Sequence, residues 1–334
     1  MTREELEERV RQLIEASDQV LIFGHKDADG DTLGCSLAFE EALRALGKTV
    51  DVVIPPPLPQ QYSWLPGFDR VVDQPRNGLE PSLVLFFDAA NLERSGSATE
   101  LIDDRATIVN IDHHPSNDRF GDINIIDPDA AAVAEMALRM LEAWRWPITP
   151  TMATNLYTAL VTDTGGFRHE NTDAAALDTA ARLARYGVVP SNVTTMVYKS
   201  RPLTTLRLNA LSMAAMRVEL EGRLAWTKVT RRMLEEAGAV MTETEDLIDN
   251  VNTLADLDIA IVFKEVDPGR TKISVRSRRI DAAEFCSKWG GGGHSRAAGA
   301  ELALPMAEAI DQVLGAARAT ITGSLDAVGS PQPQ

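Results

Sequence analysis

The residues best suited to chemistry stand at the end of an apolar run near the middle of the chain. Residues 107–111 are Thr, Ile, Val, Asn and Ile, and they are followed at once by Asp112, His113 and His114. A β-branched run of this kind predicts a buried parallel strand, and open α/β sheets place their sites at the carboxyl ends of such strands. The chain has only five histidines, so two in one motif mark this strand end as a candidate site.

Three further apolar segments, residues 19–24, 83–87 and 152–161, are followed by groups of the same kind. These acidic or imidazole residues are His25, Asp29, Asp31, Asp88 and Asp163. Carboxylates that are brought together need a cation or a shared proton, because burying a charge without a partner is costly. A metal cluster is therefore the simplest explanation of the four segments.

The second half of the chain contains a basic segment. Residues 270–296 hold seven Lys or Arg and two acidic residues, although the whole chain has a net charge of -16. In a strand, Lys272 and Arg276 would share one face, where a guanidinium could bind phosphate bidentately. Glycines 290–293 can form a concave run of backbone N–H groups, an anion nest, with His294 at its exit. The alternatives are a solubilising edge for the basic residues and a flexible hinge for the glycines.

In their order along the chain, these five motifs resemble those of the DHH family of phosphoesterases, and within it the hydrolases of short oligonucleotides called nanoRNases. The resemblance covers nearly the whole chain and implies two metal ions bridged by one carboxylate. Such a carboxylate-rich ligand set with two imidazoles suits manganese, with magnesium or cobalt as substitutes, better than it suits tetrahedral structural zinc. One ion would be held by His25, Asp29 and Asp88, and the other by Asp31, Asp88, His113 and Asp163.

The resemblance also implies roles for residues around the ions. The second imidazole of the central motif, His114, would contact the phosphate or support the ligands, and Asp112 would orient an imidazole by accepting its N–H. The catalytic set is then Asp88, Asp112 and His114. The substrate-binding set, which would hold the terminal phosphate and nucleotide, is Arg276, His294, Gly291, Gly292 and Gly293.

The implied reaction is hydrolysis of a phosphate ester by in-line attack. Two ions about 3.5 to 4 Å apart can lower the pKa of a shared water and stabilise the phosphoryl oxygens. The expected substrates are oligonucleotides of two to five residues such as pApA, cleaved to nucleoside 5'-monophosphates, and the 3'-phosphate of 3'-phosphoadenosine 5'-phosphate. A cyclic di-AMP phosphodiesterase is the alternative. An inorganic pyrophosphatase, a long single-strand exonuclease and a non-catalytic nucleotide sensor are less favoured.

Composition limits the partners and the compartment. With 33 Lys and Arg against 49 Asp and Glu, the chain lacks the extended basic surface that long nucleic acid requires, so any nucleic-acid substrate should be short. Two cysteines form no disulfide framework, and no apolar run approaches the length of a membrane span. The charged N-terminus is unlike a signal peptide. We expect a cytoplasmic protein without a membrane partner, and the resemblance allows a homodimer.

Three single residues have ordinary structural interpretations. Cys35 should be a small buried packing residue, and His169 should pack or hydrogen-bond, with pH sensing as the alternative. The family usually has proline where this chain has Ala28, which loosens the first loop without removing a ligand.

Alternating strands and helices predict an α/β fold with a doubly wound, mainly parallel sheet, followed by a smaller α/β domain and a cleft between them. Residues 58–80, rich in Pro, Gly and Gln, should be mostly loop. The expected division is a metal-binding domain at 1–190, a helical linker at 191–215, a substrate-binding domain at 216–323 and a disordered tail at 324–334.

Overall fold

The computed structural model describes residues 2–26, 28–76, 78–93, 96, 102–103, 105–245 and 247–328, with the side chains of 324–328 excepted. The chain divides into two compact units, Met1–Ser200 and Arg201–Gln334. This boundary falls inside the predicted linker, so one of its helices belongs to each unit. None of the helices in the described part of the chain combines the length and the hydropathy that a membrane crossing requires.

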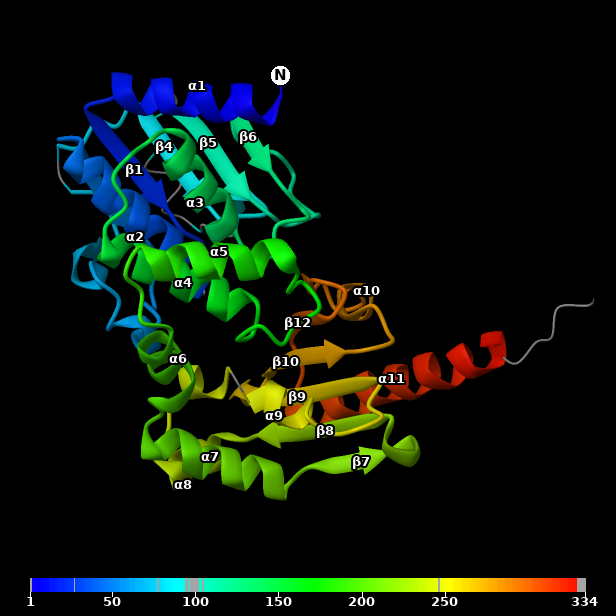
Figure 1. The fold of residues 1–334 in the computed structure, drawn as a ribbon. Helices are drawn as coiled ribbons and strands as arrows, with labels where there is room; N and C mark the ends of the chain where they lie inside the picture. Colours follow the sequence, from blue (N-terminus) through cyan, green and yellow to red (C-terminus); the bar gives the residue numbers. More distant parts are fainter. Residues whose placement is uncertain are drawn as a thin grey trace, which may run out of the picture. The chain divides into compact units, whose positions relative to one another are not determined.

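The first unit is built on a six-stranded sheet in which every pairing is parallel (Figure 1). The strand order is β3-β2-β1-β4-β5-β6, so the order reverses between β1 and β4. The predicted parallel α/β sheet is confirmed. The strands are β1 (Gln19–Phe23), β2 (Thr49–Val53), β3 (Val71–Val72), β4 (Leu83–Phe87), β5 (Thr107–Asp112) and β6 (Ile123–Ile126).

Helices pack on one face of this sheet and form the main core of the unit with it. Val20, Ile22 and Leu85 of the strands lie in the same buried cluster as Leu37 and Leu156 of the helices. The helices of the unit are α1 (Arg3–Ala16), α2 (Gly30–Ala45), α3 (Val133–Ala143), α4 (Pro150–Asp163), α5 (Ala174–Arg185) and α6 (Pro190–Lys199).

The opposite face of the sheet has a smaller core, in which Phe23 and Phe86 stack at 5.3 Å between ring centroids. Within residues 58–80, expected to be mostly loop, the structure places two short 3-10 helices (Gln60–Tyr62 and Phe68–Arg70) and the edge strand β3. The two-residue strand was missed because it is too short to show a period of two.

The second unit has a six-stranded sheet of order β11-β12-β10-β9-β8-β7, in which only β8 and β9 pair in parallel. Strands β9 and β10 run antiparallel and are joined by a turn that contains Gly269. The strands are β7 (Arg217–Glu219), β8 (Leu224–Val229), β9 (Ile259–Asp267), β10 (Arg270–Ser277), β11 (Gly292–Gly293) and β12 (Ala297–Leu302).

Helices cover both faces of this second sheet. Leu208, Leu247 and Ile248 pack with Ala260 and Val262 on one face. Helices α10 and α11 pack on the other face with the remaining strand residues. The helices are α7 (Leu203–Ala214), α8 (Arg231–Ala237), α9 (Leu247–Val251), α10 (Ala282–Ser287) and α11 (Met306–Val328).

The last helix, α11, is longer than the sequence suggests. It continues to Val328, so residues 324–328 are helical, whereas the sequence predicts disorder from 324 onward. Residues 329–334 lie outside the described part of the chain. Residues 316–319 are Ala, Ala, Arg and Ala, which are good helix formers, and no proline interrupts the segment up to Val328, although Gly323 suggests an end.

Candidate metal centre

The candidate ligands meet where the strand order of the first sheet reverses. His25 follows β1, Asp88 follows β4 and His113 follows β5. Since all these strands are parallel, their carboxyl ends share one edge, and open α/β sheets bind their ligands at that edge where the strand order reverses. Asp88 has a φ of 60°, a left-handed conformation that is costly for residues other than glycine and that clusters at functional sites.

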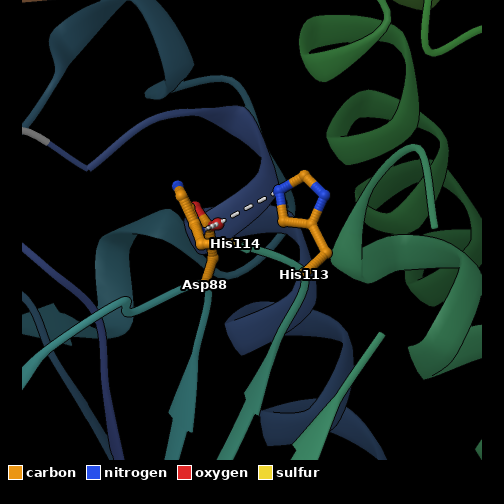
Figure 2. A group of neighbouring side chains, drawn as sticks. All are labelled: Asp88, His113 and His114. Atoms are coloured by element: carbon orange, nitrogen blue, oxygen red, sulfur yellow. Dashed lines mark ion pairs between the residues drawn. The ribbon is translucent and has the colours of Figure 1, made fainter. Parts of the chain in front are cut away.

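Three groups of side chains have donor atoms that all lie within 4.8 Å of one another. They are His25, Asp29 and Asp88; Asp31, His113 and Asp163; and Asp88, His113 and His114. The first group is the complete ligand set that the resemblance implies for one ion. The second holds three of the four residues implied for the other ion, and Oδ1 of the fourth, Asp88, lies 3.6 Å from His113 Nε2. Figure 2 shows Asp88 between the two imidazoles of the central motif.

Two imidazoles are oriented by backbone carbonyls. His113 Nδ1 donates to the carbonyl of Ala130 at 3.0 Å, and His25 Nδ1 donates to that of Lys26 at 2.5 Å. In a neutral ring, Nε2 then carries the lone pair that a metal needs. Nε2 of His113 lies 3.5 Å from Asp163 Oδ2, and Nε2 of His25 lies 3.4 Å from Asp88 Oδ2.

Asp31 and Asp88 are buried, and Asp163 is partly buried with its Oδ2 shielded from solvent. Burial raises the pKa of Asp163 to about 7, and its Oδ2 accepts no hydrogen bond from the described residues. Burial, followed by the charges of Asp88 and Asp163, raises the pKa of Asp31 well above its ordinary value. For Asp88 burial is outweighed by a hydrogen bond from His25 and by nearby imidazoles, so its pKa is lowered.

The electrostatics of the group fit a divalent cation. Burial lowers the pKa of His113, but the carboxylates of Asp163, Asp88 and Asp31 outweigh it and raise the value to about 10. A proton on this imidazole therefore partly compensates the acids in the metal-free protein. An ion ligated by the same carboxylate and imidazole atoms would replace that proton, and it would satisfy the buried oxygen of Asp163.

One short segment, residues 130–134, supports three of the ligands. Backbone N–H groups of Val133 and Ala134 donate to the two Asp31 oxygens at 2.7 and 3.2 Å, so this carboxylate caps α3. The carbonyl of Ala130 holds His113. These main-chain contacts fix the relative positions of two ligands from different elements.

Asn171 links the same segment to the third ligand. Its side-chain amide donates to the carbonyls of Ala131 at 2.9 Å and Asp163 at 3.2 Å. His169 Nδ1 also donates to the Asp163 carbonyl, at 3.2 Å, which agrees with the predicted hydrogen-bonding role of this histidine. Cys35 is buried, as expected, and its thiol contacts Asp31 Oδ1 at 3.4 Å.

The central motif contains an Asp and His pair beside the ligands. His114 Nδ1 donates to Asp112 Oδ1 at 2.7 Å and lies 3.4 Å from Asp88 Oδ1. Asp112 is fully buried at the end of β5 and therefore orients His114 rather than His113. The sequence left open which imidazole it contacts.

Two polar residues that the sequence analysis missed also hold this group. Asn117 donates to Asp112 Oδ2 at 2.5 Å, and the Thr32 hydroxyl donates to Asp88 Oδ2 at 2.8 Å. Neither position shows a pattern in the sequence, because single polar residues in loops and helix starts are common.

The substrate-binding residues that the sequence predicts lie in the second unit. Arg276, on β10, donates from Nε to Asp249 Oδ1 of α9 at 3.1 Å. His294 follows β11, and its backbone N–H donates to the carbonyl of Ala297 at 2.7 Å. The guanidinium is therefore already oriented by one carboxylate.

The glycine run does not form the predicted row of open N–H groups. The N–H groups of Gly290 and Gly291 donate to backbone carbonyls of α10, and Gly292 and Gly293 pair with β12. A Cβ at Gly291 would collide with the carbonyl of Gly299. Close packing of two backbones, rather than an anion nest, therefore explains why glycine is needed at this position.

Comparison with known proteins agrees with this architecture. Residues 19–160 match the DHH family, N-terminal domain, and residues 227–323 match the DHHA1 domain. The chain is 34% identical over 307 residues to the bifunctional oligoribonuclease and PAP phosphatase NrnA of Thermus thermophilus, covering 91% of this chain and 90% of that protein. It is 24% identical over 338 residues to the cyclic-di-AMP phosphodiesterase PdeA of Listeria monocytogenes, covering 93% of this chain and 49% of that protein.

A solved structure has the same fold along almost its full length. The exopolyphosphatase-related protein of Bacteroides fragilis superposes with a TM-score of 0.87 at 22% identity, covering 94% of this chain and 95% of that one. Together with the two matched domains, the extended identity to a curated relative decides the family. The chain belongs to the DHH family of phosphoesterases, with a DHHA1 domain after its DHH domain.

Proposed function

We propose that this protein hydrolyses short oligonucleotides such as pApA to nucleoside 5'-monophosphates, and removes the 3'-phosphate of 3'-phosphoadenosine 5'-phosphate. The observation that carries the proposal is the convergence of buried and partly buried carboxylates and imidazoles on one sheet edge, including an Asp163 oxygen that accepts no hydrogen bond from the described residues. The similarity to an oligoribonuclease and PAP phosphatase supports the same substrates.

The metal ligands would be the six residues that lie in the first two groups. Two bound divalent cations, manganese with magnesium or cobalt as substitutes, would supply charge stabilisation and an acidified water. Asp88 belongs to the first group, and its Oδ1 lies 3.6 Å from Nε2 of His113 in the second, so its carboxylate would serve both ions. The ligands are His25, Asp29, Asp31, Asp88, His113 and Asp163.

The residues beside the ligands would handle the phosphate. His114, oriented by Asp112, would contact a phosphate oxygen at the reacting centre. In the second unit, Arg276 and His294 would bind the terminal phosphate and nucleotide, with Gly291, Gly292 and Gly293 shaping the backbone beside them. Arg276 keeps N–H groups of its fork for a phosphate after donating to Asp249.

Charge supports a short substrate. The chain carries 16 more acidic than basic groups, and long single strands bind through extended positive grooves. A substrate of two to five nucleotides needs only local contacts. A cytoplasmic location, which the composition favours, and a homodimer, which the resemblance allows, are part of the same proposal.

The deciding experiment compares five substrates at equal concentration with manganese: pApA, a 20-mer, 3'-phosphoadenosine 5'-phosphate, cyclic di-AMP and pyrophosphate. We expect rapid turnover of pApA and of 3'-phosphoadenosine 5'-phosphate, with products separated by chromatography. The Asp88→Ala variant, purified in the same way, controls for contaminating nucleases. Rapid hydrolysis of the 20-mer alone would contradict the proposal, and exclusive hydrolysis of cyclic di-AMP would favour the alternative that the Listeria relative represents.

A further inference from the structure

One asparagine connects the two loops that carry the central residues of the site. The Asn117 amide donates to the carbonyl of Ala89 at 3.0 Å and to Asp112 Oδ2 at 2.5 Å. Ala89 directly follows Asp88 at the end of β4, and Asp112 ends β5. A single side chain therefore bonds to both neighbouring strand ends.

Further contacts keep this asparagine and its loop in place. Its Oδ1 accepts from the N–H of Arg119 at 2.7 Å, and the N–H of Asp118 donates to the carbonyl of Ala90 at 3.0 Å. Asn110 on β5 donates to the carbonyl of Ala89 at 3.2 Å. The asparagine amide is thus held in a defined orientation by the loop around it.

The contact with Asp112 matters because of what that carboxylate does. Asp112 is fully buried, and a buried carboxylate must have its lone pairs satisfied. Its Oδ1 accepts from His114 and its Oδ2 accepts from Asn117. Because the Asn117 amide holds Oδ2 of Asp112, Oδ1 of the same carboxylate is held in the position where it accepts from His114 Nδ1. The position of Oδ1 therefore sets the orientation of the His114 ring.

We propose that Asn117 is a positioning residue for His114, acting through Asp112, and that it sets the placement of the His114 ring relative to Asp88. The chain of contacts runs from Asn117 to Asp112 to His114, whose Nδ1 lies 3.4 Å from Asp88 Oδ1. The contribution to catalysis rests on the proposed function, whereas the positioning itself does not.

Two variants of Asn117 distinguish the loss of its N–H donor from a general disturbance of the loop. Asn117→Ala removes the whole amide, and Asn117→Asp keeps the acceptor for the Arg119 N–H while replacing the donor with a carboxylate that faces Asp112. Asn124→Ala is the matched control. Its amide also bonds to backbone groups of this loop, at Gly121 and Arg119, and it makes no recorded bond to Asp112.

The first measurement does not depend on activity. In metal-free protein labelled with ¹⁵N-histidine, the hydrogen-bonded Nδ1–H of His114 is identified by its loss in His114→Ala. We expect this signal to move or disappear in Asn117→Asp and Asn117→Ala, and to stay in Asn124→Ala. An unchanged signal in both Asn117 variants would overturn the positioning role.

The second measurement is a double-mutant cycle on pApA hydrolysis at saturating manganese. Asn117→Asp should lower kcat by about 10- to 100-fold, as groups that orient active residues typically do. In a His114→Ala background the same change should cost less than about twofold, because the contact then has nothing to orient. Equal losses in both backgrounds would overturn the proposal. A lost Nδ1–H signal in a protein without any of the expected activities would support the positioning and count against the proposed function alone.

Discussion

Both units bury charged side chains, but they compensate them differently. In the first unit Asp31, Asp88 and Asp163 gather around imidazoles, and the pKa of two of these acids is raised. In the second unit Lys264 is fully buried on β9, and its Nζ lies 3.1 Å from Glu245 Oε1. In the first unit the carboxylates outnumber the positive charges that could balance them. In the second unit the ammonium of Lys264 is balanced by the carboxylate of Glu245.

This difference separates a ligand site from a structural ion pair. Burial lowers the pKa of Lys264. Burial acts to raise the pKa of Glu245, but the charges of Lys264, Lys272 and Arg276, with the hydrogen bond from Lys264, together outweigh it and lower the value. Such a pair is complete within the chain. Carboxylates whose pKa is raised by one another instead favour a proton or a cation from outside. The first unit should therefore respond strongly to metal and pH, and the second to changes in packing and in substrate contacts.

The largest effect should come from Asp88, which two groups of candidate ligands share. We expect Asp88→Ala to lower turnover of pApA by more than about 100-fold, beyond the usual cost of losing a supporting residue, and to reduce bound manganese. Equilibrium dialysis followed by metal analysis measures the second quantity. Asp178→Ala, which removes an exposed carboxylate on α5, is the control. Full activity with undiminished manganese would show that no carboxylate is shared.

Metal removal should expose a pH dependence set by Asp163 and His113. The pKa of Asp163 rises to about 7 and that of His113 to about 10 in the folded protein. Both raised values make the native state bind more protons than the unfolded chain, so stability falls as pH rises from about 4 to 10. Each proton contributes up to about 1.4 kcal/mol per pH unit.

This dependence can be measured as Tm between pH 5 and 8 with a chelator and with manganese. We expect Tm to fall with pH without metal, and manganese affinity to rise by about tenfold per pH unit for each proton released. Asp163→Asn should flatten the lower part of the metal-free curve. A metal-free Tm that rises steadily over this range would contradict the compensation by protons.

In the second unit, loss of a side chain proposed to bind phosphate should affect KM rather than metal content. Arg276→Ala and His294→Ala should each raise KM by about tenfold or more, the cost of one charge-assisted contact, with manganese retained. Arg270→Ala is the matched control, because this arginine lies on the same strand and pairs with Asp267 and Glu301. Unchanged kinetics would remove both residues from the binding site.

The glycine run offers a comparison of two neighbours. Gly291→Ala should destabilise the second unit by about 1 to 3 kcal/mol, because the new Cβ meets the carbonyl of Gly299. A Cβ at Gly292 has no atom within 4 Å, so Gly292→Ala should change the free energy of unfolding by less than about 0.5 kcal/mol. Urea unfolding measures both. Equal losses would show that the strand pairing does not decide the need for glycine.

A small effect should also come from Lys264→Met. This change removes a buried ammonium and leaves Glu245, whose side chain is 53% exposed, able to meet water. We expect the free energy of unfolding at pH 7 to change by less than about 1 kcal/mol. A loss of more than about 3 kcal/mol would show that the ion pair holds the unit together.

The strands that carry the candidate site could be predicted from the sequence. Residues 19–24, 83–87 and 107–111 are apolar runs too regular to be loops, and parallel pairing brings their ends to one edge. The acids and histidines that follow these strands were recognisable as candidate ligands, because burying a charge without a partner is costly. This is why the sequence could bring His25, Asp88 and His113 together.

The contacts that hold these groups could not be predicted. Main-chain atoms of residues 130–134 and the amides of Asn117 and Asn171 act through space, between segments far apart in the sequence. Nor could the sequence show that glycines 290–293 pair with a strand, since four glycines are compatible with many backbone conformations. The alternatives for this run were an anion-binding row of open N–H groups and pairing with a neighbouring strand. Only the folded chain shows the pairing of Gly292 and Gly293 with β12.

The support that Asp31 and His113 receive from residues 130–134 comes from peptide groups, which every amino acid carries. These hydrogen bonds therefore depend on the path of the backbone and not on the side chains of the segment, which are restricted instead by the burial of residues 131–134 in the core. A search for shared residues would overlook such a segment in distant homologues. An engineer who wishes to alter the centre would gain more from shortening or lengthening it than from changing its side chains.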